Sequence, residues 1–202
     1  NRYCVVYNGE IFNYREIRSE LLDLGHRFSS DSDTEVLISA WSEWGEQSLK
    51  KLDGMFAFVI IDTVENQITA ARDALGVKPL FVKEEHDEVL FSSEIWPLVD
   101  PKSEPNLQVI YDYLSFGYYD NSPQTFISGI RVVPGGHRIQ FANSDFPRLS
   151  TIDWWSPDFS NSRDSTSEHQ AVREIREGFL KAIDTHMRSD VPLGFALSGG
   201  LD

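Results

Sequence analysis

The first part of the chain combines a short apolar run with two amphipathic stretches, which is the pattern of a strand followed by helices. Residues 3–7 form a β-rich apolar run that predicts a strand, and Asn8-Gly9 after it is a turn signal. Apolar residues then recur at helical spacing over 13–25 and over 32–45, and each stretch ends in glycine. We therefore expect one strand and two helices in this order.

Strand signals dominate the middle of the chain. Polar turns of hairpin length separate four runs rich in aromatic and β-branched residues, over 55–63, 67–73, 79–84 and 88–94. Residues 106–118 then have the pattern of a helix, and 129–141 have the pattern of a hairpin around Pro134-Gly135-Gly136. Strands mixed with helices in this way predict an α+β domain over about the first 150 residues.

The last part of the chain has a different composition. A polar segment rich in Ser and Asp precedes an amphipathic helical stretch over 168–187. An apolar run over 191–197 then predicts a buried strand that leads into a Ser-Gly-Gly turn. A helix, a buried strand and a glycine loop are how an α/β nucleotide-binding domain begins. The predicted organisation is a first domain over 1–157, a linker over 158–167 and the start of a second domain over 168–202.

Composition and charge narrow the classes of partner. The 202 residues are 41% hydrophobic, which permits a sizeable core. The net charge of −14 repels nucleic acids and anionic membranes, so neither is an expected partner. A single cysteine excludes a disulfide framework, which fits the reducing cytoplasm. The chain has no initial Met, and its first residues already have the pattern of a strand, so we expect a fragment that is cut at both ends.

Ser198-Gly199-Gly200 is the first candidate for chemistry. A glycine turn after a buried strand can aim several backbone N–H groups at one anion, and the serine hydroxyl adds a donor. The turn matches neither a Walker A loop nor G-x-G-x-x-G. Asp202 could contact Mg²⁺ or orient the loop, and an ordinary tight turn remains the alternative. The five histidines have no ligand spacing, so no metal site is predicted.

Asn8, Gly9, Glu10 and Asp33 form the second candidate. Hydrolysis of the glutamine side-chain amide needs hydrogen-bond donors for the oxyanion, which the Asn8 carboxamide and the Gly9 backbone N–H can supply. Glu10 and Asp33 can pair with the α-ammonium group. The residue types alone favour a purely structural interpretation, with a turn at Asn8-Gly9, a surface charge at Glu10 and a helix N-cap at Asp33.

The order of the motifs resolves this ambiguity through a resemblance. The segment VPLGFALSGGLD resembles the pyrophosphate-binding loop of N-type ATP pyrophosphatases. NGEIFNY, SDTEVL, LDGMFAFVIID, ARDALGVKPLF and GIRVVPGGH precede it, and together they resemble glutamine-hydrolysing asparagine synthetases of the bacterial type over nearly the whole chain. The resemblance implies an α+β class II glutaminase domain, an incomplete N-terminal-nucleophile αββα sandwich. The first helix and strand of an α/β nucleotide-binding domain would follow it.

The resemblance also implies roles for single residues. Asn8 and Gly9 correspond to the oxyanion hole, and Glu10 and Asp33 to the groups that bind the glutamine ammonium. The residues that correspond to the start of the ATP and pyrophosphate site are Leu197, Ser198, Gly199, Gly200 and Asp202. We expect 72–80 to be a structural turn with a satisfied ion pair.

One departure concerns the nucleophile. The family uses a cysteine at the first position of the mature protein, whereas this chain begins at Asn1. Cys4 is not expected to replace it, because it lies within a strand and has no free α-amine to act as base. We expect Cys4 to be buried as a small apolar residue.

The implied activity is ATP-dependent asparagine synthesis. Glutamine would be hydrolysed to ammonia, and aspartate would be activated as β-aspartyl-AMP with ATP and Mg²⁺, giving asparagine, AMP and pyrophosphate. The expected partners are therefore glutamine, aspartate and ATP; a homodimer stays open. We expect the 202 residues alone to be inactive. Two alternatives remain: a related amidotransferase that acts on a sugar or peptide carboxylate, and a non-catalytic glutamine-binding module.

Overall fold

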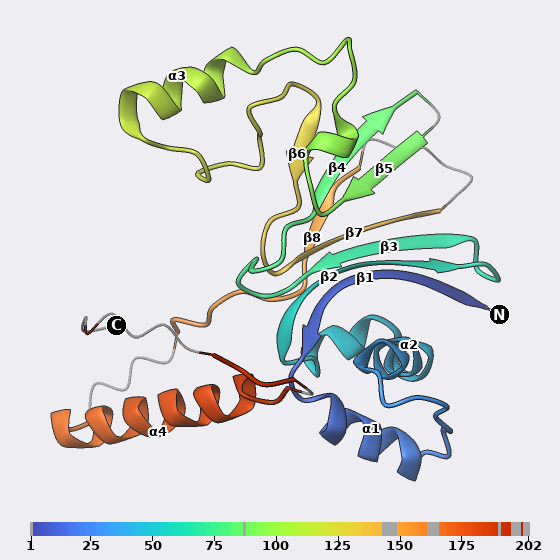
Figure 1. The fold of residues 1–202 in the computed structure, drawn as a ribbon, viewed down its shortest axis with the longest axis vertical. Helices are drawn as coiled ribbons and strands as arrows, with labels where there is room; N and C mark the ends of the chain where they lie inside the picture. The colour runs from blue at the N-terminus through green and yellow to red at the C-terminus, as the bar shows by residue number, and fades with distance from the viewer. Residues whose placement is uncertain are drawn as a thin grey trace. The chain divides into compact units, whose positions relative to one another are not determined.

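The computed structural model describes residues 2–86, 88–142, 149–160, 166–189, 191–194 and 199. The chain divides into two compact units, Asn1–Pro157 and Asp158–Asp202, each described by itself. The first unit contains two antiparallel sheets (Figure 1). One sheet has the order β1 (Tyr3–Ile11), β2 (Gly54–Asp62), β3 (Gln67–Arg72), β7 (His137–Ala142) and β8 (Thr151–Asp153). The other has the order β5 (Glu88–Ser92), β4 (Phe81–Glu85) and β6 (Ile130–Val132).

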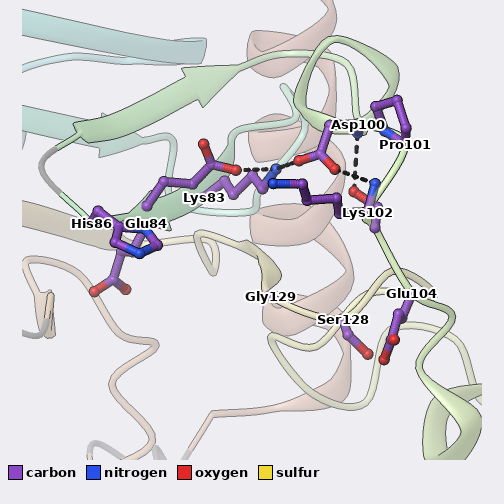
Figure 2. Close-up of a pocket in the computed structure, with 11 residues that line it drawn as sticks. Lys83, Glu84, His86, Asp100, Pro101, Lys102, Glu104, Ser128 and Gly129 are labelled. Atoms are coloured by element: carbon purple, nitrogen blue, oxygen red, sulfur yellow. Dashed lines mark hydrogen bonds and ion pairs between the residues drawn. The ribbon is translucent and has the colours of Figure 1, made fainter.

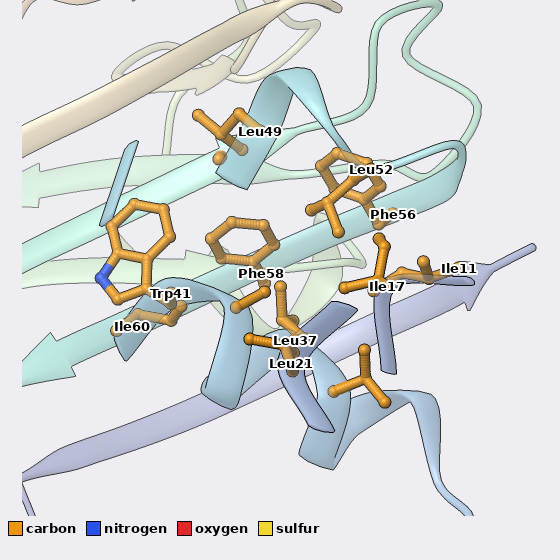
Figure 3. Packing of buried hydrophobic residues seen from close by; sticks show 13 residues of the cluster. Ile11, Ile17, Leu21, Leu37, Trp41, Leu49, Leu52, Phe56, Phe58 and Ile60 are labelled. Carbon is orange, nitrogen blue, oxygen red and sulfur yellow. The ribbon is translucent and has the colours of Figure 1, made fainter. Parts of the chain in front are cut away.

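Two helices, α1 (Tyr14–Asp23) and α2 (Asp33–Trp44), cover one face of the five-stranded sheet (Figure 1). Ile17 and Leu21 are the buried residues of α1, as its helical spacing predicts. Ser32 caps α2 by accepting a hydrogen bond from Thr34 N at 3.1 Å. The helices pack on β2 through a cluster that includes Phe58, whose ring meets Trp41 edge-on (Figure 3). A turn of 3₁₀ helix, η1 (Gly45–Lys50), follows α2.

The three-stranded sheet lies on the other face of β2, β3 and β7 (Figure 1). The apolar layer between the sheets includes Ala57, Ala70, Val82 and Ile139. Because β2 has packed residues on both faces, its sequence is a continuous apolar run rather than an alternating one. The described layers are therefore helix, sheet and sheet. Outside them lie a short 3₁₀ turn, η2 (Trp96–Leu98), and α3 (Leu107–Phe116), both in the first unit.

Two expected turns are wrong. Asn8-Gly9 is not a turn, because β1 continues to Ile11 and pairs there with Gly54. A Cβ on Gly54 would lie 2.3 Å from Glu10 O, so this glycine serves the close approach of two strands. Likewise, 129–141 is not a hairpin, because β6 pairs with β4 whereas β7 pairs with β3 and β8. The Pro-Gly-Gly segment instead carries the chain from one sheet to the other.

The turn over 72–80 is structural, but its charged residues bind the backbone. Arg72 donates to the carbonyl oxygens of Gly76, Lys78 and Val133 at 2.5–2.7 Å. Asp73 is 1% exposed and accepts four backbone N–H groups, from Phe56 and from three residues of the turn itself. The ion pair expected within 72–80 is wrong, because Arg72, Asp73 and Lys78 take part in no salt bridge among the described residues. The two side chains thus satisfy backbone groups of the turn and of the neighbouring Phe56 and Val133.

The second unit contains α4 (Glu168–His186), capped by Ser167. Its apolar stripe, Val172, Ile175, Phe179 and Ile183, is exposed. The strand expected over 191–197 is absent from its described part, 191–194, where Val191 is 67% exposed. A strand of a parallel sheet is formed and buried only against neighbouring strands and covering helices, which the described part of this unit does not supply. No described helix is long and apolar enough to cross a membrane.

Candidate functional site

Three of the sequence candidates, Asn8, Gly9 and Glu10, lie near the C-terminal end of β1. Among the described residues, β1 is an edge strand of the five-stranded sheet. Their cross-strand neighbours on β2 are Ala57, Phe56 and Met55, respectively. A Cβ on Gly9 would lie 2.3 Å from Met55 O and 2.7 Å from Phe56 Cα. Glycine at this position is therefore required by the close approach of β2.

The pairing of β1 fixes the direction of the Gly9 N–H. Phe56 uses both of its backbone groups on the β3 side, accepting from Asp73 N at 2.7 Å and donating to Asp73 Oδ2 at 3.2 Å. Gly9 and Phe56 are thus a pair without mutual hydrogen bonds, which is also the close type of pair. The N–H and C=O of Gly9 consequently point away from β2, toward the outer edge of β1.

Asp33 is attached to this same edge. Its Oδ2 accepts hydrogen bonds from Ile11 N at 3.1 Å and from the Tyr7 hydroxyl at 2.7 Å. Ile11 lies two residues after Gly9 and therefore has the same backbone direction. The first residue of α2 is in this way brought to the strand that carries Asn8, Gly9 and Glu10, so the structure brings together all four candidates from the front of the chain.

Two carboxylates act on the Tyr7 hydroxyl. Burial, the hydrogen bond to Asp33 and the charges of Asp33 and Glu10 all raise the pKa of Tyr7 far above its usual value of 10. Tyr7 is therefore a neutral donor that holds Asp33 in place. Asp33 bonds to Tyr7 and to Ile11 N, and Glu10 lies between these two residues on β1, so two carboxylates belong to this end of the strand. Such a site suits an ammonium group.

Ser93 belongs to the motif FSSEIWPLV, which also resembles the family, but no role was predicted for it from the sequence. Asn8 Nδ2 donates a hydrogen bond to Ser93 Oγ at 3.0 Å, across 85 positions of the chain. Ser93 follows β5 and continues the alternation of Val89 and Phe91, which pack into the layer between the sheets. That alternation predicts the inward direction of Ser93, but no local signal shows that Asn8 lies opposite.

Cys4 is exposed, which corrects the expectation that it is buried. Side chains alternate along β1, and Tyr3, Val5 and Tyr7 pack against the cluster beneath the helices. Cys4 therefore falls on the opposite face together with Val6, which is 70% exposed. The β-rich run indicates a strand correctly, but it does not show which face is covered.

The expected phosphate loop cannot be described as a site. Leu197, Ser198, Gly200 and Asp202 lie outside the described residues. Gly199 is described and has φ = +80°, a conformation that favours glycine.

A cavity of about 1020 Å³ opens beside the β4–β5 hairpin (Figure 2). Lys83, 8% exposed, lines it and binds the carboxylates of Glu85 and of Asp100, the latter at 2.5 Å. These bonds, chiefly the one to Asp100, raise the pKa of Lys83. None of the site candidates that the structure describes lines this cavity. Since its buried cation is already paired, we assign the cavity no chemistry.

Curated relatives match the chain over nearly its whole length. It is 35% identical to asparagine synthetase [glutamine-hydrolyzing] 1 of Bacillus subtilis (strain 168), over 99% of this chain and 31% of that protein. It is 36% identical to asparagine synthetase [glutamine-hydrolyzing] 2 of Oryza sativa subsp. japonica, over 98% of this chain and 28% of that protein. The chain thus spans about a third of the length of the curated relatives that it matches.

Solved structures are similar in fold. The glutamine phosphoribosylpyrophosphate amidotransferase of B. subtilis, complexed with ADP and GMP, superposes with a TM-score of 0.54 at 20% identity, over 77% of this chain and 30% of that one. This likeness supports the N-terminal-nucleophile amidotransferase fold expected from the sequence. Residues 174–202 match the asparagine synthase family. Residues 1–155 match the glutamine amidotransferase domain family, and the chain belongs to that family.

Proposed function

We propose that this chain is part of a glutamine-hydrolysing asparagine synthetase, with its glutaminase in the first unit and the start of its synthase in the second. The relatives that match along the chain carry this name, and the matches to the two families occur in the corresponding order. The whole protein would release ammonia from glutamine and use it to amidate aspartate.

The observation that carries the proposal is the attachment of Asp33 to Ile11 N, two residues from the outward-facing N–H of Gly9. One strand edge thereby presents a carboxylate beside a backbone donor. A free glutamine has an α-ammonium group at one end and an amide at the other, and it needs both features in one site. Asn8 and Glu10 add a second donor and a second carboxylate from the same strand.

The roles of these residues in hydrolysis follow from their chemistry. Glu10 and Asp33 would bind the α-ammonium of glutamine, and Asp33 would be oriented by Tyr7 and by Ile11 N. Asn8 Nδ2 and the Gly9 N–H would donate to the oxyanion that forms at the amide carbon. The nucleophile is not Cys4, because that residue lies within β1 and has no free α-amine to act as base. A terminal cysteine elsewhere in the whole protein would supply the attacking thiol.

The synthase part of the proposal rests on the match over 174–202 and on the motif at 197–202. Leu197, Ser198, Gly199, Gly200 and Asp202 would begin the site for ATP and its pyrophosphate. ATP with Mg²⁺ would supply the activation of aspartate as β-aspartyl-AMP. The 202 residues alone are expected to catalyse neither half of the reaction.

The test uses the full-length protein that contains these residues. Purified protein is incubated with ATP, Mg²⁺ and aspartate, with either glutamine or ammonium chloride as nitrogen source, and asparagine, glutamate and pyrophosphate are measured. Asparagine from both sources supports the proposal. Glutamine hydrolysis without aspartate-dependent pyrophosphate would favour another acceptor carboxylate. Glutamine binding without hydrolysis would favour a non-catalytic module, and either result would overturn the proposal.

A further inference from the structure

The contact between Asn8 and Ser93 joins the two sheets of the first unit at the candidate oxyanion hole. Asn8 lies on β1 of the five-stranded sheet, and Ser93 directly follows β5 of the three-stranded sheet. Their 3.0 Å hydrogen bond lies beyond the apolar layer that Val89 and Phe91 enter from β5. On the faces of β1 and β5 that look into this layer, the residues before Asn8 and Ser93 are apolar. Asn8 and Ser93 are the polar residues that follow them, and they pair with each other.

The two serines at the end of β5 have different contacts. Ser92 Oγ accepts a hydrogen bond from Glu94 N at 3.1 Å, which turns the chain at the end of the strand. Ser93 Oγ instead accepts from Asn8 Nδ2. Because the neighbouring serine already serves the turn, the contact of Ser93 is not needed to end the strand.

The chemistry of a primary amide explains what this contact does. Nδ2 of Asn8 carries two N–H groups, and the terminal torsion of an Asn side chain is broad, so a free carboxamide samples many orientations and can flip. When one N–H is bound by Ser93 Oγ, the plane of the amide is fixed. The second N–H then keeps one direction and stays available for an oxyanion.

We propose that Ser93 is a positioning residue for glutamine hydrolysis, which orients the Asn8 carboxamide as an oxyanion donor. The proposal rests on the glutaminase function proposed above. Ser93 acts through Asn8 and does not itself touch substrate. Binding of the glutamine α-ammonium belongs to Glu10 and Asp33, so the loss of Ser93 affects the transition state rather than the affinity for substrate.

The experiment compares Ser93→Ala, Ser93→Thr and Ser92→Ala in the full-length protein. Glutamine hydrolysis and ammonia-dependent asparagine synthesis are measured for each variant and for the unchanged protein. Removal of a whole oxyanion donor costs roughly 100- to 1000-fold in kcat, and loss of its orientation costs a part of this. We expect Ser93→Ala to lower kcat for glutamine about tenfold with KM little changed. Ser93→Thr keeps the hydroxyl and restores most of the rate.

The controls separate positioning from general damage. Ammonia-dependent synthesis is expected to stay unchanged in every variant, and Ser92→Ala is expected to keep the glutamine kcat. Equal glutamine kcat in Ser93→Ala and the unchanged protein would overturn the role of Ser93 and leave the glutaminase proposal intact. A parallel loss in both serine variants, or no rescue by Thr, would also overturn it. No glutamine hydrolysis by the unchanged protein would overturn both proposals.

Discussion

The carboxylate of Asp33 accepts the backbone N–H of Ile11 at 3.1 Å, on the outer edge of β1. This bond joins the start of α2 to a strand that is 22 positions earlier in the sequence. It places a negative charge two residues from Gly9, whose N–H points to the same edge. The candidate site is therefore assembled by one helix start and one strand end.

Asp33→Asn separates the charge of this residue from its structural bonds. The amide oxygen can still accept from Tyr7 and Ile11, so we expect little change in stability, while the lost charge weakens binding of the glutamine ammonium. We expect KM for glutamine to rise by at least tenfold in the full-length protein, on the scale of 1.4 kcal/mol for each factor of ten. Steady-state kinetics measures the effect. Tyr7→Phe, which keeps the charge, is the control and should change KM less.

Gly9→Ala tests the close approach of β1 and β2. The added methyl would lie 2.3 Å from Met55 O, so the strands must move apart or β1 must shift. We expect a loss of about 2 kcal/mol in the free energy of unfolding and a glutaminase rate at least tenfold lower. Urea denaturation and glutamine hydrolysis measure the two effects. Gly178→Ala on α4 has nothing within 4 Å of its Cβ and should be neutral or slightly stabilising.

Asp73→Asn tests the carboxylate beneath the turn at 72–80. Each of its two oxygens accepts two backbone N–H groups, so an Asn side chain would direct its NH₂ at two of these donors. Two backbone N–H groups would lose their acceptor at a side chain that is itself buried, and we expect a loss of roughly 2–4 kcal/mol in unfolding free energy. Asp53→Asn, at an exposed position just before β2, is the comparison. Equal denaturation midpoints for the two variants would contradict this prediction.

Asp62 gives the fold an acid-sensitive contact. The bidentate hydrogen bond from Arg2, with help from the backbone N–H groups of Glu65 and Val64, lowers the pKa of Asp62 from 3.8 to about 2. The ionised form favours folding, so the contribution is complete above about pH 4 and is lost as the pH falls toward 2. We expect Asp62→Asn to be less stable than the unchanged protein at pH 7 and nearly equal to it at pH 2. Thermal unfolding across this range measures the difference, and a gap that stays constant with pH would contradict the prediction.

Cys4 allows a simple test of the nucleophile. Its exposed thiol on β1 should react readily with a thiol reagent in the folded chain. Cys4→Ser should leave the glutaminase activity of the full-length protein unchanged, because Cys4 lies within a strand and has no free α-amine. Loss of that activity in Cys4→Ser would show that the catalytic thiol has been misassigned.

Local pattern was sufficient for most helices and strands, whereas the candidate site residues were identified through a family resemblance. Helical spacing and glycine ends indicated α1 and α2 almost to the residue, and β-rich runs indicated β2, β3, β4 and β5. Asn8, Gly9, Glu10 and Asp33 were found through motifs, and the folded chain brings them to one strand edge. The helices and strands are encoded locally, because helix periodicity, capping and strand composition act within a few residues.

Pairing between distant segments was decided only in three dimensions. Asn8-Gly9 has the composition of a turn, yet β2 holds it in a strand because glycines at 9 and 54 let the two backbones approach. Pro134-Gly135-Gly136 has the composition of a hairpin turn, yet it joins two different sheets. The face on which Cys4 lies, and the meeting of Asn8 with Ser93 across 85 positions, depend likewise on which strands become neighbours. Strand pairing is non-local, so short-range sequence preference cannot specify it.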